Sequence, residues 1–356
     1  MNHREIVTWL RETDAASLAE LWRMADATRQ SHVGGEVHLR GLIEFSNYCM
    51  RLCAYCGLRA PNDQVTRYRM SAEEILDCVR QAVALGYGTV VLQSGEDPLT
   101  RTEWMTDVIR RIKAETSLAV TLSLGERSDE DLAAWRAAGA DRYLLRFETS
   151  NRALFDRIHP PRPDGPTDRL PILRRLRELG YEVGSGVMIG IPGQTYDDLA
   201  RDIELFGQLD LDMIGCGPFL PNPQTPLGEQ DTWESAPEGE QVPNSELMTY
   251  KVIALTRLVC PRANIPSTTA LATINTRNGR ELGLVRGANI IMPNLTPPEY
   301  RIHYEIYPNK ACIHETAQAC NQCIRARIRA IGREVGTGRG DSPNHGYHQI
   351  NLVDES

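Results

Sequence analysis

The sequence has no apolar run of about eighteen residues, the length that crosses a bilayer, so it predicts no membrane-spanning helix. Its polar start, Met-Asn-His-Arg-Glu, lacks the apolar core of a secretory signal. It has no dense basic tract, and its net charge is −8, which argues against a nucleic-acid surface. We therefore expect a cytoplasmic protein with neither a membrane nor a nucleic acid as partner.

The chain also lacks the regular cysteine spacing of a secreted, disulfide-bonded domain, although it holds nine cysteines. In a reducing compartment such cysteines are cluster ligands or small buried apolar residues. The 356 residues are 41% hydrophobic and 24% charged, an ordinary globular composition with enough apolar material for one large domain.

Three cysteines, Cys49, Cys53 and Cys56, form a C-x3-C-x2-C pattern directly after an apolar run. Three thiolates can hold three irons of a cubane and leave the fourth iron open for a small ligand. The alternative is a zinc loop, which needs a fourth ligand. The nearest candidates are His38 and Cys78, both outside the loop. The pattern therefore favours a 4Fe-4S cluster with one open position.

Eight strand-like apolar runs alternate with amphipathic helical stretches along most of the chain. Eight is the number of strands that closes a (β/α)8 barrel, and apolar strands fit a parallel sheet buried on both faces. We expect a complete (β/α)8 barrel. The strand-like runs are 37–45, 89–93, 119–124, 143–147, 187–191, 213–218, 264–269 and 288–292.

The predicted barrel has extensions at both ends. Residues 1–36 should form N-terminal helices, and 37–300 the barrel. Residues 301–333 should form a C-terminal cluster-binding segment, and the polar, Gly-rich residues 334–356 a flexible tail. Ser71 and Glu74 form a capping box for a helix over 72–85.

Polar side chains stand at the ends of the predicted strands, where a barrel carries its active site. Arg146 and Glu148 are two residues apart, so both should point to one face of their strand, as a ligand site or as a structural ion pair. Arg169 lies further along the chain, and its planar guanidinium group could bind a carboxylate. Thr268 and Thr269 end the seventh run, and they either contact a ligand or cap a loop.

A second cysteine set, Cys312, Cys320 and Cys323, forms C-x7-C-x2-C near the C-terminus. It could hold an auxiliary cluster, a zinc ion with His314 as a fourth ligand, or nothing if these cysteines only pack.

Together these features resemble the HydE family, the radical S-adenosylmethionine (SAM) maturases of FeFe-hydrogenase. The biotin synthase and PylB families are its neighbours. The resemblance covers about residues 30–333. Segment 43–59, with the first cysteine set, alone identifies the radical SAM superfamily. The resemblance rests on segments 43–59, 91–98, 121–126, 141–149, 190–195, 217–219, 265–270 and 288–294, together with the second cysteine set.

The resemblance implies roles for individual residues. Cys49, Cys53 and Cys56 would hold the SAM-binding 4Fe-4S cluster. Other residues would bind SAM, namely Tyr55, Ser123, Glu148 and Arg169. A third group would line the substrate cavity, namely Arg146, Thr268, Thr269, Tyr304 and Tyr307. Phe147 departs from the family, where we expect His, and we expect it to point away from the cavity.

The resemblance implies a maturase that cleaves SAM to a 5′-deoxyadenosyl radical and processes an iron–cysteine–CO–CN synthon. The synthon would be the product of HydG, the acceptor scaffold would be HydF, and the reductant a ferredoxin or flavodoxin. The second set could hold an auxiliary 2Fe-2S or 4Fe-4S cluster. Two alternatives stay open. One is a radical SAM enzyme with an organic substrate, either a PylB-like mutase or a biotin synthase-like sulfur insertion. The other is a non-catalytic cluster carrier.

Overall fold

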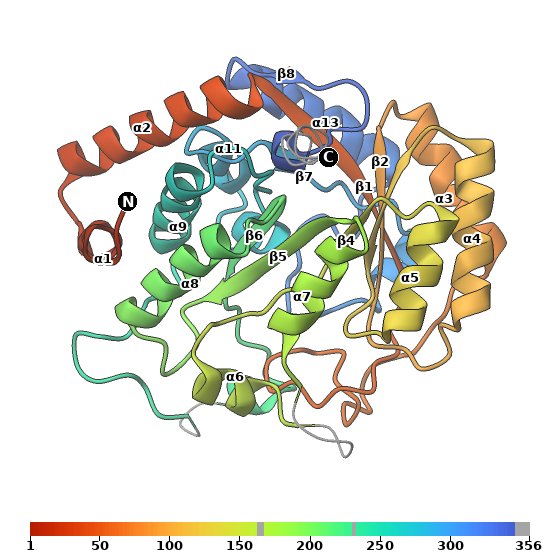
Figure 1. The fold of residues 1–356 in the computed structure, drawn as a ribbon, viewed down its shortest axis with the longest axis horizontal. Helices are drawn as coiled ribbons and strands as arrows, with labels where there is room; N and C mark the ends of the chain where they lie inside the picture. Colours follow the sequence, from red (N-terminus) through yellow and green to blue (C-terminus); the bar gives the residue numbers. More distant parts are fainter. Residues whose placement is uncertain (162–166, 230–232, 346–356) are drawn as a thin grey trace.

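The computed structural model of the protein describes residues 1–161, 167–229 and 233–345. Its centre is a parallel sheet with helices on the outer side (Figure 1). The strands lie in the order β6-β5-β4-β3-β2-β1-β7, and β8 pairs with β1. The strands are β1 (Glu36–Ser46), β2 (Thr89–Ser94), β3 (Ala119–Ser123), β4 (Arg142–Leu144), β5 (Glu182–Ile189), β6 (Met213–Pro218), β7 (Ile290–Ile291) and β8 (Glu334–Val335).

The helices begin and end where the sequence provides caps. Ser71 and Glu74 form the predicted capping box, and Gly139 ends α5 with a left-handed φ of 110°. No helix in the described ranges is long and apolar enough to cross a membrane. The helices are α1 (His3–Arg11), α2 (Ala15–Val33), α3 (Ala72–Ala84), α4 (Thr102–Glu115), α5 (Asp129–Ala138), α6 (Arg152–Ile158), α7 (Arg169–Glu178), α8 (Tyr196–Gln208), α9 (Glu246–Val259), α10 (Thr269–Ile274), α11 (Gly279–Leu284), α12 (Pro298–Arg301) and α13 (Ala317–Ala330).

The sheet is an open, partial barrel, so the prediction of a complete eight-strand barrel is wrong. The run 264–269, expected to be a strand, makes only single bridges, from Asn264 to Met213 and from Pro266 to Ile290. Proline has no N–H to donate to a ladder, and this explains why no regular strand forms there. The continuous ladder therefore stops at β6 on one side and at β7 on the other.

The strand register brings polar residues together at one end of the sheet. Glu44 of β1 pairs with Gln93 of β2, and Gln93 pairs with Ser123 of β3. All of these strands run parallel, so their carboxyl ends meet on the same side. This end of the sheet carries the candidate site.

The opposite end of the sheet is covered by residues 334–345, which the sequence predicted as part of a flexible tail. The Thr89 hydroxyl donates to the Arg339 carbonyl at 2.7 Å, and Arg40 Nη2 donates to the Gly340 carbonyl at 2.9 Å. The buried Arg142 pairs with Asp341. Two buried arginines thus obtain acceptors from this segment. Residues 346–356 lie outside the described ranges.

Candidate active site

The first cysteine set lies in an irregular loop between β1 and α3, at the carboxyl end of the sheet. Three backbone N–H groups fix the loop to other segments. Met50 donates to the Glu96 carbonyl at 3.0 Å, Ala54 to Ile158 at 2.8 Å, and Gly57 to Ile306 at 2.8 Å. The loop is therefore held from three sides.

Two glycines allow the cysteine loop to pack this closely. A Cβ on Gly95, just after β2, would meet the Tyr48 carbonyl oxygen and would lie 2.7 Å from Cys49 Cβ. A Cβ on Gly57 would lie 2.5 Å from Asn222 Nδ2. These distances are below van der Waals contact, so both positions need a residue without a side chain.

The three thiols are close enough to influence one another. The pKa of Cys53 is raised to about 12: burial is the largest cause, the Arg169 guanidinium opposes it, and the neighbouring Cys49 adds to it. Burial is also the largest cause that raises the pKa of Cys49 and of Cys56. The thiols of the protein alone are therefore protonated at neutral pH, and iron binding would displace their protons.

The thiol set suits a cubane better than a single ion. Across the described residues, no three His, Cys, Asp or Glu side chains converge on one point that could hold a metal ion. In a cubane each thiolate binds a different iron, so the three thiols need not converge on one point. Three mutually adjacent thiols in one fixed loop can therefore bind it.

A charged cluster of four side chains lies beside the thiols: Arg51, Glu96, Glu126 and Arg169, each at most 8% exposed. Arg169 Nε donates to Glu126 Oε1 at 3.0 Å, and Arg51 Nε lies 3.7 Å from Glu96 Oε2. Burial raises the pKa of Glu96. Arg51 Nη1 and Glu96 Oε2 are buried, and neither has a hydrogen-bond partner among the residues that the structure describes. Such orphan atoms in a dry site indicate a place for a polar ligand.

Glu148 lies next to this cluster in a strained backbone conformation, with a φ of 63°. Its Oε2 lies 3.1 Å from Arg146 Nη2 but accepts no hydrogen bond of good geometry. Arg169 Nη1 donates to the Arg146 carbonyl at 2.6 Å. The structure therefore brings the predicted residues Arg146, Glu148 and Arg169 together, and strain of this kind is common at ligand sites. Ser123 ends the neighbouring β3 and is half-buried.

Tyr55, directly before Cys56, connects the cysteine loop to Glu148. Its hydroxyl lies 2.9 Å from His159 Nε2 and 3.4 Å from Glu148 Oε1. Burial lowers the pKa of His159, so the imidazole is neutral. The Tyr55 hydroxyl donates to Glu148 Oε1 and lies within hydrogen-bond distance of His159 Nε2. No local sequence pattern indicated a role for His159, because it contacts Tyr55 only in the folded chain.

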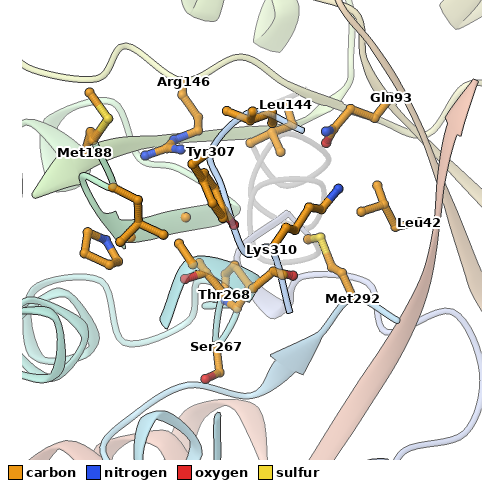
Figure 2. A pocket seen from close by; sticks show the side chains of 18 of the residues that line it. Leu42, Gln93, Leu144, Arg146, Met188, Ser267, Thr268, Met292, Tyr307 and Lys310 are labelled. Atoms are coloured by element: carbon orange, nitrogen blue, oxygen red, sulfur yellow. The ribbon is translucent and has the colours of Figure 1, made fainter. Parts of the chain in front are cut away.

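A cavity of about 220 Å³ lies beside Tyr55, within the partial barrel that the sheet forms (Figure 2). Four predicted substrate residues line it, namely Arg146, Thr268, Thr269 and Tyr307. Tyr304 is not among its lining residues: it is buried, with its hydroxyl 3.3 Å from Nε2 of Gln93, which does line the cavity. Phe147 packs against Phe206 of α8 with ring centroids 5.6 Å apart, so the expectation that it points away is confirmed.

The cavity also contains an ion pair that the sequence analysis missed. Lys310 Nζ donates to Glu44 Oε1, and Asn294 Nδ2 donates to Glu44 Oε2 at 2.7 Å. Both charged side chains are at most 6% exposed and line the cavity. One signal was available: Glu44 interrupts the apolar strand run 37–45, where a carboxylate needs a partner.

The second cysteine set lies close to the far wall of the cavity. Cys320, on α13, donates its S–H to the Cys312 sulfur, and Arg280 Nη1 lies 3.6 Å from the same sulfur. These two donors lower the pKa of Cys312. Cys323 is exposed on α13. Two of the three thiols are therefore in contact, and Arg280 connects them to the cavity that it also lines.

Known proteins match this chain over most of its length. The sequence profile of the Radical SAM superfamily matches residues 43–206. The chain is 46% identical to the [FeFe] hydrogenase maturase subunit HydE of Thermotoga maritima over 321 residues, 90% of this chain and 88% of that protein. It is 29% identical to the 3-methylornithine synthase of Methanosarcina acetivorans, over 77% of this chain and 74% of that enzyme.

The solved structure of methylornithine synthase (PylB) has a TM-score of 0.78 to this chain at 23% identity, over 98% of this chain and 96% of that one. This likeness shows a shared fold. The sequence identity to HydE, together with the superfamily profile, is far more specific evidence of the family than this shared fold. The chain belongs to the HydE family of radical SAM enzymes, the [FeFe] hydrogenase maturases.

Proposed function

We propose that this protein cleaves SAM reductively to methionine and a 5′-deoxyadenosyl radical, and that the radical acts on an iron–cysteine–CO–CN synthon of the hydrogenase diiron subcluster. The observation that carries the proposal is the position of Tyr55. It precedes a thiol of the cysteine loop, its hydroxyl reaches Glu148, and its side chain lines the cavity. A radical formed beside the loop would therefore face the cavity directly.

In this proposal Cys49, Cys53 and Cys56 hold a 4Fe-4S cluster. When bound, the cluster supplies the one electron that breaks the C5′–S bond of SAM. The family also implies SAM itself. The orphan atoms Arg51 Nη1 and Glu96 Oε2 support a polar ligand at this place.

Three residues around the loop would bind SAM. The Glu148 carboxylate would accept from a ribose hydroxyl or from the SAM ammonium group, because its Oε2, although 3.1 Å from Arg146 Nη2, accepts no well-aligned hydrogen bond from the described residues. The Arg169 guanidinium would meet the SAM carboxylate. The Ser123 hydroxyl, at the end of the next strand, would contribute a further hydrogen bond. Tyr55 would pack against the bound molecule.

The cavity would hold the substrate in a largely dry environment. Leu42, Leu144, Met188 and Met213 form apolar parts of its wall and exclude water from a reactive radical. Arg146 Nε is buried without a partner, so it can donate to an anionic or nitrogen-bearing group of the substrate. The hydroxyls of Thr268, Thr269 and Tyr307 add polar contacts, and Tyr304 would act through Gln93.

The proposal places the protein between two partners in a maturation sequence. Its substrate would be the product of HydG, its product would pass to the HydF scaffold, and a ferredoxin or flavodoxin would reduce the cluster. The second cysteine set would hold an auxiliary 2Fe-2S or 4Fe-4S cluster that turnover does not require.

The test is anaerobic reconstitution with iron and sulfide, followed by SAM and dithionite, with 5′-deoxyadenosine as the readout. The wild type should form it, and Cys53→Ser should not. Cys78→Ser, a buried thiol on α3 outside the loop, is the matched control and should retain activity. Absence of 5′-deoxyadenosine from the wild type, with and without the synthon, would contradict the proposal.

Two further outcomes refine the proposal. If 5′-deoxyadenosine forms but the synthon is not converted, the organic-substrate alternative replaces the maturase reaction. If Cys320→Ser abolishes turnover, the second cluster is not dispensable.

A further inference from the structure

The cysteine loop presents apolar side chains to solvent. Met50 and Leu52 alternate with the proposed cluster ligands and are 44% and 39% exposed. Leu99 is 56% exposed and belongs to the loop after β2, whose Glu96 carbonyl accepts the Met50 N–H. These three exposed side chains, which we call the apolar patch, belong to two loops that the Met50–Glu96 hydrogen bond joins beside the thiols. Exposed large apolar side chains on loops at a functional site are typical of a protein-interaction surface.

The same surface is basic, although the whole chain has a net charge of −8. Residues 47–69 contain four arginines and one acidic residue, Asp63. Arg51 is buried in the charged cluster, and Arg69 pairs with Asp97. Arg59 and Arg67 donate only to backbone carbonyls, including that of Leu52.

The loops after β2 and β3 add one basic group each. Arg101, in the loop after β2, is exposed, and Arg127, in the loop after β3, donates to the carbonyls of Asp97 and Thr100. Within the described part of the chain, none of Arg59, Arg67, Arg101 and Arg127 forms an ion pair with a carboxylate. Their positive charge is therefore available to a partner, and its attraction would act over about 10 Å at ordinary ionic strength.

We propose that the apolar patch, with its rim of Arg59, Arg67, Arg101 and Arg127, is the docking surface for a small acidic one-electron carrier protein. In Figure 1 the cysteine loop forms the orange trace at the lower edge of the molecule, away from α1 and α2. The inference rests on the proposed function, because that function needs an external electron. An acidic carrier bound here would place its redox centre next to the loop, and opposite charges would orient it.

The first test measures binding, which requires no turnover. Isothermal titration calorimetry of the reconstituted protein with an oxidised acidic ferredoxin should give a complex that weakens about tenfold in the double variant Arg59→Glu/Arg101→Glu. The control Arg4→Glu/Arg174→Glu makes the same charge change on α1 and α7, where both arginines are exposed, and should leave the affinity unchanged.

The wild type alone provides a second test that does not depend on a variant fold. Raising the salt concentration from about 50 to about 500 mM should weaken the complex strongly, because screening shortens the reach of the charges. Salt-independent binding, no binding of ferredoxin to the wild type, or equal affinity for the double variant would each overturn the docking surface.

Turnover separates this inference from the proposed function. With dithionite as reductant, the double variant should form 5′-deoxyadenosine at the wild-type rate, whereas with reduced ferredoxin it should need about tenfold more carrier for half its maximal rate. If dithionite gives no product with the wild type, the proposed function fails. If both reductants serve the double variant equally well, only the docking surface fails.

Discussion

Gly95→Ala should damage the cysteine loop through one added methyl group. The new Cβ would lie 2.7 Å from Cys49 Cβ, whereas carbon atoms pack at about 3.5–4 Å, so Cys49 must move by about 1 Å. It would also meet the Tyr48 carbonyl, which belongs to the backbone and cannot rotate away. Overpacking costs about 1–3 kcal/mol, and the lower entropy of the unfolded chain offsets about 0.4–1 kcal/mol of this cost.

The expected net destabilisation of Gly95→Ala is therefore about 1–2 kcal/mol, measured by urea denaturation of the protein before reconstitution. Iron and sulfide bound after reconstitution should also fall, because the three thiols no longer hold their relative positions. Gly207→Ala in α8 is the matched control: its Cβ meets only the Val259 side chain at 3.3 Å, and alanine is the better helix residue. Wild-type iron binding and a stability loss below about 0.5 kcal/mol in Gly95→Ala would refute the steric argument.

Three further perturbations test other parts of the structure. Lys310→Met leaves the Glu44 carboxylate buried without its cation and should lower the free energy of unfolding by about 3–5 kcal/mol in urea denaturation. The double variant Lys310→Met/Glu44→Leu should recover most of that loss. No loss in the single variant would show that water reaches Glu44. Ending the chain at residue 333 removes two acceptors of Arg142, namely Asp341 and the Arg339 carbonyl, and should lower the thermal midpoint by several degrees. An unchanged midpoint would mean that residues 334–345 contribute no stability. Hydrogen bonds to Asp197 and Glu204 raise the pKa of His3. The stability difference between wild type and His3→Gln should therefore be largest below about pH 6.5 and vanish as the pH rises through the pKa of His3 in the folded protein. A stability difference that grows with pH would contradict this assignment.

Local patterns predicted much of the structure. The capping box at Ser71 and Glu74, the irregular cysteine loop and the polar strand ends all depend on residues near one another in sequence. Arg146 and Glu148 were expected on one face of a strand because they are two apart, and the structure places them in contact. Both lie beyond the end of β4 and Glu148 has a left-handed φ of 63°, so strand alternation does not explain this contact.

Other features depend on contacts between distant segments and left little signal. Lys310 and Glu44 are 266 positions apart, and only the folded chain shows that they pair. The run 264–269 is apolar like a strand, but Pro266 cannot donate to a ladder. The Gly-rich residues 334–345 resemble a loose tail in composition, yet they supply acceptors to buried arginines on the sheet.

In the proposed function, three thiols hold a cluster whose fourth iron binds SAM. The most direct test is electron–nuclear double resonance of the reduced, reconstituted protein with SAM labelled with ¹⁵N at its amino group. We expect a hyperfine coupling between the label and the cluster, which Glu148→Ala should weaken or abolish. A reduced cluster whose spectrum does not change when SAM is added would show that SAM does not bind the fourth iron.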